Sequence, residues 1–188
     1  METRLASQIS HTFGAVTDRM LLLLVCMGTL VAAAHASQSQ ATHDSAPPSP
    51  YIDKGACPFE CCTYRNWVAT QKITLVDHPN SKKLVAHVHK GEEVQGLTGE
   101  VHSIPLRVVA TVDDPDAKLK RGDVIYVLHY VGEGYWRVWH NGQLVSIENF
   151  SDKGPYPQST WWVQTKTKSG IVGWTISHGN FSNQDACG

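Results

Sequence analysis

The stretch Tyr135-Trp-Arg-Val-Trp-His-Asn-Gly-Gln-Leu-Val-Ser-Ile147 predicts a β-hairpin. Its two arms are rich in aromatic and β-branched residues, as strands are. Asn141-Gly142 stands between the arms, and this dipeptide favours a tight hairpin turn because both residues tolerate positive φ. We therefore expect two antiparallel strands joined at this turn.

Further short strands are predicted on both sides of this hairpin. They are separated by turn signals such as Lys90-Gly91 and Asp113-Asp-Pro-Asp116. No segment has the periodicity of an amphipathic helix of three turns or more. Many short strands with such turns are typical of a small barrel or sandwich, so the predicted fold class is all-β. The predicted strands are 73–76, 83–89, 93–98, 99–112, 123–131, 161–165 and 170–176.

Three segments resemble bacterial SH3-like (SH3b) domains. Gly91-Glu-Glu-Val-Gln-Gly-Leu-Thr-Gly99 resembles a strand and turn of that family, and the hairpin above resembles its central hairpin. Trp162-Val-Gln-Thr-Lys-Thr-Lys-Ser-Gly-Ile-Val-Gly-Trp174 contains the closing Gly-x-x-Gly-Trp pattern, the most specific of the three. The resemblance covers residues 55–188 and implies two small SH3-like barrels in tandem, packed together.

The resemblance also implies a division of the chain into modules. The first module, with the cysteine segment, is expected over residues 55–112. The second is expected over residues 113–188, with an insertion near 148–160. We place the boundary at 113–117 because Asp and Pro cluster there as they do in turns.

The N-terminal part of the chain predicts export. Residues 1–36 combine a polar start, an apolar run and an Ala34-His-Ala36 cleavage site, which is typical of a signal peptide. An uncleaved N-terminal anchor is the alternative. Residues 37–54, rich in Pro, Ser and Gln, are predicted to form a flexible leader. No later segment is apolar enough to span a membrane, so we expect the mature protein in the periplasm or the medium.

Four cysteines follow the predicted signal peptide: Cys57, Cys61, Cys62 and Cys187. Cysteines of exported proteins are typically paired in disulfides, and four cysteines allow three pairings. A bond between adjacent Cys61 and Cys62 is strained. We therefore expect one short bridge within the 57–62 segment and one long bridge to Cys187. No helix follows these cysteines, so a catalytic thiol is not expected.

Histidines offer a weak candidate metal site. His87 and His89 share one face of a predicted strand, and His102 follows a hairpin away. Two or three imidazoles bind Zn or Cu, but no carboxylate or cysteine accompanies them at a fixed spacing. The alternative is that they are exposed polar positions opposite apolar ones. We therefore expect no metal and no cofactor.

Aromatic residues concentrate in the second half of the chain and form the candidate binding surface. Aromatic-lined grooves bind sugar rings and extended peptides. Alternation places Tyr135 and Trp139 on the face opposite Val138, which we expect to point inward. The alternative is that most of these rings pack in the core or between modules. The candidate ligand-binding residues are Tyr135, Arg137, Trp139, Tyr156, Trp161 and Trp162.

These observations predict a non-enzymatic exported module. A net charge of −1 provides no basic field for nucleic acid or anionic lipid. No paired carboxylates, Ser-His-Asp order or phosphate-binding glycine loop stand at usable spacing, so no catalytic residue is expected. The SH3b resemblance implies cell-wall glycan or peptide as the partner. The alternative is a structural or assembly protein that docks another envelope protein through its SH3-like face.

Overall fold

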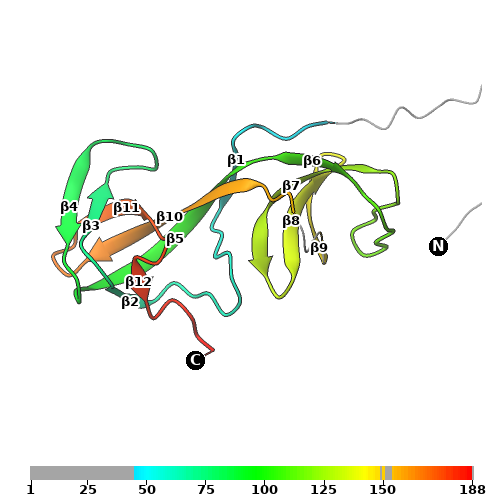
Figure 1. Cartoon of the computed structure of the whole chain (residues 1–188). Helices are drawn as coiled ribbons and strands as arrows, with labels where there is room; N and C mark the ends of the chain where they lie inside the picture. The colour runs from blue at the N-terminus through cyan, green and yellow to red at the C-terminus, as the bar shows by residue number, and fades with distance from the viewer. Residues whose placement is uncertain (1–44, 149, 151–153, 188) are drawn as a thin grey trace, which may run out of the picture. The chain divides into compact units, whose positions relative to one another are not determined.

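The secondary-structure elements of the described residues are all β-strands, which confirms the predicted all-β class. This computed structural model describes residues 45–148, 150 and 154–187, all within one compact unit of the chain. The predicted signal peptide and the first part of the predicted leader lie outside these residues. The described part contains no helix long and apolar enough to cross a membrane. Its strands form two antiparallel sheets (Figure 1).

The first sheet is a curled half-barrel built around its longest strand, β5 (Glu93–Ile104). One edge of β5 pairs with β10 along nearly its whole length, and the other edge pairs with β2 and then with β1. The strand order is β12-β2-β5-β10-β11-β3-β4. The remaining strands are β1 (Tyr51–Lys54), β2 (Asn66–Ala69), β3 (Ile73–Val76), β4 (Leu84–Val88), β10 (Gln158–Thr167), β11 (Val172–Ile176) and β12 (Phe181–Ser182).

The second sheet is a four-stranded meander inserted between β5 and β10. At the β8–β9 turn, Asn141 and Gly142 have positive φ angles of 49° and 79°. The hairpin predicted from this dipeptide is confirmed, with Val138 opposite Val145 in the ladder. The strands are β6 (Leu106–Val109), β7 (Val124–Gly132), β8 (Tyr135–His140) and β9 (Gln143–Glu148).

Each sheet has its own hydrophobic core. In the first core the Trp67 indole is fully buried, and its Nε1 donates a hydrogen bond of 3.0 Å to the Thr63 carbonyl oxygen. Burying a large apolar side chain contributes about 3 kcal/mol, so this ring is a main stabilising element of the first sheet. The first core is Trp67, Ala69, Ile73, Leu75, Val88, Val94, Val163 and Phe181, and the second is Ala110, Ala117, Leu119, Ile125, Val127, Val138 and Ile147.

Strand β1 joins the two sheets. Asp53 on β1 accepts a hydrogen bond of 2.8 Å from Nε2 of His129 on β7. Tyr51 on β1 contacts Trp139 on β8, with ring centroids 5.9 Å apart. The chain itself passes from β5 to β6 through Pro105, which interrupts the strand because proline has no N–H for a ladder. The second sheet is therefore held to the first by side-chain contacts as well as by the chain.

The predicted leader extends too far. Tyr51–Lys54 falls inside the expected leader at 37–54, yet it forms β1 and pairs with β5 from Glu100 to Ser103. The mixed polar and apolar side chains of this segment give little local strand signal. Its conformation depends on pairing with a strand that lies far away in the sequence.

The expected module boundary does not separate the two sheets. The turn at 113–117 lies between β6 and β7, which pair with each other. β6, expected in the first module, belongs to the second sheet, whereas β10, β11 and β12 return to the first sheet. The stretch near 148–160 carries the chain from the end of β9 back to β10. Local patterns could not reveal this return, because it depends on the long-range pairing of β10 with β5.

Candidate functional site

Two disulfides fix the segment that precedes β2. Cys57 bonds to Cys62, and Cys61 bonds to Cys187 across a sequence separation of 126. The four cysteines are therefore disulfide-bonded, in one short and one long bridge as the sequence predicts. The long bridge ties the C-terminal segment to residues 57–62, which we call the disulfide loop.

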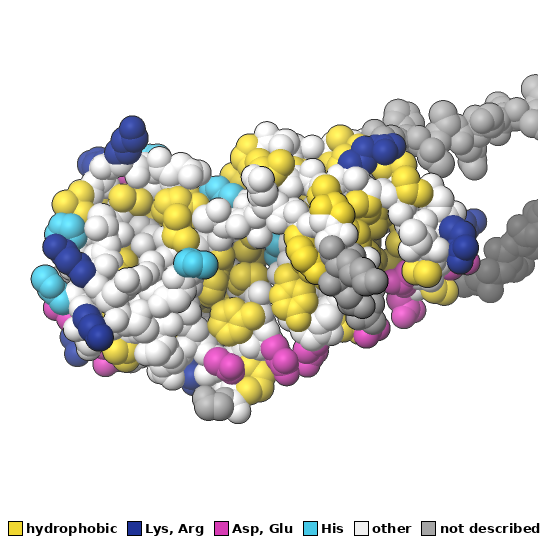
Figure 2. Space-filling view, viewed as in Figure 1, with side chains coloured by type: hydrophobic (Ala, Val, Ile, Leu, Met, Phe, Trp, Pro, Cys, Tyr) yellow, Lys and Arg dark blue, Asp and Glu magenta, His cyan; other side chains and the backbone are white. Residues whose placement is uncertain are grey.

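The disulfide loop faces the tip of the β7–β8 hairpin across a groove of about 480 Å³, the disulfide-loop groove. Gly132 permits the close approach: its φ is 114°, and a Cβ added there would lie 2.8 Å from the backbone nitrogen of Glu60. Any other residue would push the loop away. Figure 2 shows hydrophobic side chains gathered in the middle of this face, bordered below by acidic ones. The lining residues are Phe59, Glu60, Cys61, Val131, Gly132, Glu133, Tyr135 and Ser146.

Two aromatic rings line the groove, one from each element that borders it. Tyr135 begins β8 and is 40% exposed. Phe59 comes from the disulfide loop and packs edge-on against Trp161, with centroids 5.7 Å apart. Trp161 packs edge-on in turn against the buried Trp67, at 6.3 Å. The first core thus supports the position of Phe59, and Tyr135 presents its ring to solvent.

Carboxylates border the same groove. Glu60 and Glu133 line it, whereas Glu148, opposite Tyr135 in the β8–β9 ladder, lines the hollow beside β6. All three residues are exposed. Within the described part of the chain, none of the three carboxylates has an ion pair or a hydrogen bond. Uncompensated charges of one sign create a local negative potential.

A polar network adjoins the groove and includes Ser146, which lines it. Nε of Arg137 is 3.6 Å from Asp53 Oδ2, and its Nη1 donates to Ser146 Oγ at 3.1 Å. The hydrogen bond from His129 holds the pKa of Asp53 below its ordinary value, helped by the charges of His129 and Arg137 and opposed by burial. The Arg137 guanidinium, in a side chain that is 33% exposed, is thus held by Asp53 and by the groove residue Ser146.

Of the six candidate ligand-binding residues, Tyr135 alone lines the groove. Tyr135, Arg137 and Trp139 share one face of β8, and Val138 on the other face is fully buried, as alternation predicts. Trp139, however, packs between the sheets, and its Nε1 donates to the Ser45 carbonyl oxygen at 2.7 Å. The strand alternation was predicted correctly, but it does not tell which residues of the outer face another strand will cover.

The candidates Trp161 and Trp162 lie on β10 of the first sheet, near Trp174 on β11. Trp161 packs against the first core. Trp162 and Trp174 are each only 9% exposed, and the Trp162 ring lies 6.5 Å from His102. These three indoles serve packing, which is the alternative that the sequence left open.

Tyr156 belongs to a separate aromatic group on the second sheet. Its ring stacks on Trp136, with centroids 5.5 Å apart and an interplanar angle of 5°. Tyr130 and Phe150 pack edge-on against the same indole. Tyr156 remains 51% exposed, but its neighbours are aromatic and it lies outside the disulfide-loop groove.

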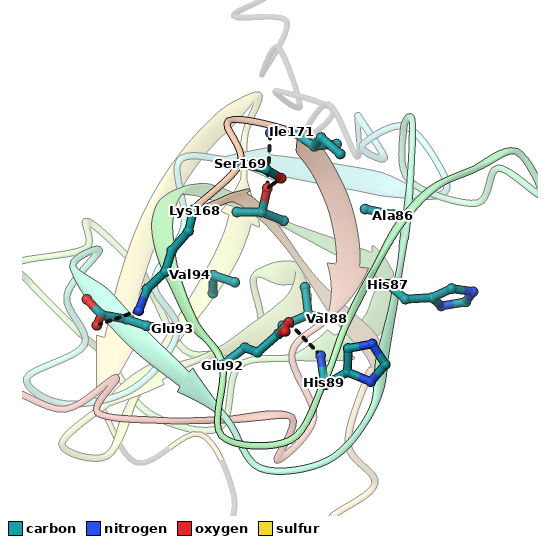
Figure 3. Close-up of a pocket in the computed structure, with 11 residues that line it drawn as sticks. Ala86, His87, Val88, His89, Glu92, Glu93, Val94, Lys168, Ser169 and Ile171 are labelled. Carbon is teal, nitrogen blue, oxygen red and sulfur yellow. Dashed lines mark hydrogen bonds and ion pairs between the residues drawn. The ribbon is translucent and has the colours of Figure 1, made fainter.

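A second hollow, of about 410 Å³, lies between β4, the start of β5 and the β10–β11 turn (Figure 3). Its charged groups are compensated internally. Lys168 Nζ is 3.9 Å from Glu93 Oε2, and Glu92 Oε2 accepts a hydrogen bond of 2.8 Å from the His89 backbone nitrogen. His87 and His89 turn their rings away from the hollow (Figure 3). It therefore offers a ligand fewer free groups than the disulfide-loop groove does.

The candidate metal ligands His87, His89 and His102 are not brought into one group. The first two are exposed near the end of β4, whereas Nε2 of His102 lies 3.0 Å from a glutamate on β5. In the described residues, one group of three potential ligands lies close together, and it combines Glu60 with the two cysteines of the long disulfide. A disulfide-bonded cysteine is not a thiolate ligand, so this group does not form a metal site.

Comparison with protein-family models, with curated proteins and with solved structures finds no match to this chain.

Of the eight residues that line this groove, the sequence singled out only Tyr135 and Cys61. Phe59 and Glu60 stand between the cysteines, Glu133 stands between two glycines, and Ser146 lies inside β9. A cysteine-closed segment and a glycine-flanked turn do indicate loops of fixed shape. Nothing in their local sequence indicates that the two loops meet.

Proposed function

We propose that this protein is an exported, non-enzymatic module of SH3-like architecture that binds cell-envelope glycan or peptide in the disulfide-loop groove. The observation that carries the proposal is a groove lined by Tyr135 and Phe59, with a disulfide-closed loop as its rim. Aromatic faces bind sugar rings and extended peptides at little cost in side-chain entropy. A rim fixed by disulfides is organised before the ligand arrives, which lowers the entropic cost of binding.

The fold and the cysteines support the architecture and the compartment in this proposal. The curled first sheet, built of antiparallel strands around a small core, is compatible with an SH3-like barrel, and the Gly170-Ile-Val-Gly-Trp174 pattern lies at β11. The four-stranded second sheet, with its own core, would be the second module. Two disulfides favour an oxidising compartment, in agreement with the signal peptide predicted for residues 1–36.

Co-sedimentation with purified peptidoglycan sacculi tests this function. We expect the purified protein to sediment with sacculi and Tyr135→Ala to bind about tenfold more weakly, since losing a stacked ring costs about 1.4 kcal/mol. Tyr156→Ala is the matched control, because Tyr156 is also an exposed tyrosine but lies outside the groove. Failure of the wild type to sediment, or equal weakening by both substitutions, contradicts the proposal.

A second candidate function, docking of another envelope protein, is favoured by one observation. Val109 and Val112 are 52% and 60% exposed beside a hollow of about 300 Å³ that the second core partly lines. Exposed apolar side chains beside an apolar hollow are typical of protein contacts. Cross-linking in the native envelope separates the two functions: a single protein linked near β6 favours docking, and links to glycan strands or stem peptides favour the groove.

A further inference from the structure

Two of the three described glutamates that lack a partner, Glu60 and Glu133, line the disulfide-loop groove. The third, Glu148, stands opposite Tyr135 in the β8–β9 ladder but lines the hollow beside β6. The other described glutamates are all engaged: Glu92 with the His89 backbone, Glu93 with Lys168 and Glu100 with His102. The guanidinium of Arg137, which shares a face of β8 with Tyr135, is engaged by Asp53 and Ser146. Among the described residues, Glu60 and Glu133 therefore have no ion-pair partner, and Arg137 reaches the groove only through Ser146.

The inner surface of the groove complements this rim. Tyr135, Phe59 and Val131 supply apolar surface between the carboxylates. A tyrosine face attracts a cation through its ring quadrupole, and it also packs against methylene groups. An ammonium group on an aliphatic stem fits both the apolar inner surface and the acidic rim of the groove, because the stem contacts the rings while the amine reaches the carboxylates.

We propose that the disulfide-loop groove binds the lysine side chain of an extended peptide, with the amine between Glu60 and Glu133 and the stem along Tyr135. This inference rests on the proposed function, since it names the chemical class of the envelope ligand. The charge complementarity of the rim selects a cation, and the apolar walls select a cation with a methylene stem over a compact amino sugar.

Titration of the purified protein, followed by the NMR signals of the backbone amides of residues 131–135, tests this assignment. The probes are the peptide acetyl-Gly-Lys-Gly-amide, the same peptide acetylated on the lysine amine, and glucosamine. The first probe is expected to shift these signals in a saturable manner. The acetylated peptide has the same stem without the charge, and it is expected to bind at least fivefold more weakly, as is glucosamine.

Charge-neutral, isosteric substitutions locate the interaction. Glu60→Gln and Glu133→Gln are each expected to weaken binding of the lysine peptide about two- to fivefold, and the double substitution about tenfold. Asp116→Asn removes the same charge from an exposed position outside the groove and is expected to leave binding unchanged. Because all three positions are exposed, the variants are expected to fold like the wild type.

The outcomes separate this inference from the proposed function. Tighter binding of the lysine peptide, lost in the double substitution, supports the inference. Equal binding of the acetylated peptide, preference for glucosamine, or no binding of any probe overturns it, even where the protein sediments with sacculi. If the lysine peptide binds but sacculi do not, the groove still selects amines and the envelope function is the part that fails.

Discussion

Asp53→Asn is expected to lower the free energy of unfolding by about 2 kcal/mol, because it removes a carboxylate that is hydrogen-bonded to a buried imidazole and lies beside Arg137. His129 is 2% exposed, and both of its ring nitrogens face acceptors at 2.8 Å: the Tyr130 carbonyl oxygen and Asp53 Oδ2. Asp53 Oδ2 is also 3.6 Å from Nε of Arg137, so one carboxylate serves both the imidazole and the guanidinium. Asparagine would leave Arg137 without this carboxylate and would weaken the hydrogen bond from His129.

The magnitude follows from the burial of the pair. A hydrogen bond to a charged group contributes about 1.5–3 kcal/mol, whereas removing one partner of a fully buried pair costs about 3–5 kcal/mol. The Asp53 side chain is 14% exposed, so water partly screens it. The asparagine oxygen still accepts one hydrogen bond from His129. The loss in free energy of unfolding is therefore expected in the lower of these two ranges, about 1.5–3 kcal/mol.

The effect should also depend on pH. The hydrogen bond from His129 holds the pKa of Asp53 below its ordinary value of 3.8. A carboxyl group with a depressed pKa stabilises the folded state above the unfolded-state pKa, and this contribution is lost as the pH falls through the folded-state pKa. The difference in stability between wild type and Asp53→Asn is therefore expected to be full at about pH 6 and to shrink below about pH 4.

Urea denaturation with the disulfides intact, followed by tryptophan fluorescence between about pH 6 and pH 3, measures both effects. Asp116→Asn serves as the control, because it removes the same charge from an exposed turn. The reasoning is refuted by a loss no larger than that of the control. It is also refuted by a loss that stays constant from about pH 6 to pH 3.

Three further predictions concern the groove and its supports. Gly132→Ala is expected to lower the free energy of unfolding by about 2 kcal/mol, because the φ of Gly132 is 114° and the Glu60 backbone lies against it. An unchanged urea midpoint would contradict this close approach. Cys187→Ser removes the disulfide to Cys61. The chain-entropy model predicts that the free energy of unfolding falls by about 4–5 kcal/mol for a loop of this length. A fall of less than about 1 kcal/mol would contradict a stabilising role for the disulfide. Burial raises the pKa of Tyr64 to about 12, so an absorbance titration should show a phase near pH 12 that Tyr64→Phe removes. Stability should fall as the pH rises from about 10 to 12, and the absence of that phase contradicts the burial of Tyr64.

Strands with strong local signals were predictable, and strands defined by distant partners were not. Asn141-Gly142 predicted the β8–β9 hairpin because the turn chemistry is local. Tyr51–Lys54 carries little signal of its own and becomes β1 through pairing with β5. The return of β10 to the first sheet depends in the same way on a partner encoded far away, and so the sequence could not divide the strands between the two sheets.

The candidate site was predictable only in part, for a similar reason. Alternation along β8 correctly placed Tyr135 opposite the buried Val138. The same argument could not show that Trp139 is covered by β1, nor that Glu60 meets the β7–β8 turn. Single-strand periodicity determines the face of a side chain, whereas exposure depends on which other segment packs there.

The most direct test of the binding groove is an NMR map of the amide signals that change when soluble, enzymatically released peptidoglycan fragments are added. The account predicts that the changes concentrate in residues 57–62 and 131–135 and are lost in Tyr135→Ala. Changes confined to residues 109–112, or no changes at all, would contradict a ligand site in the disulfide-loop groove.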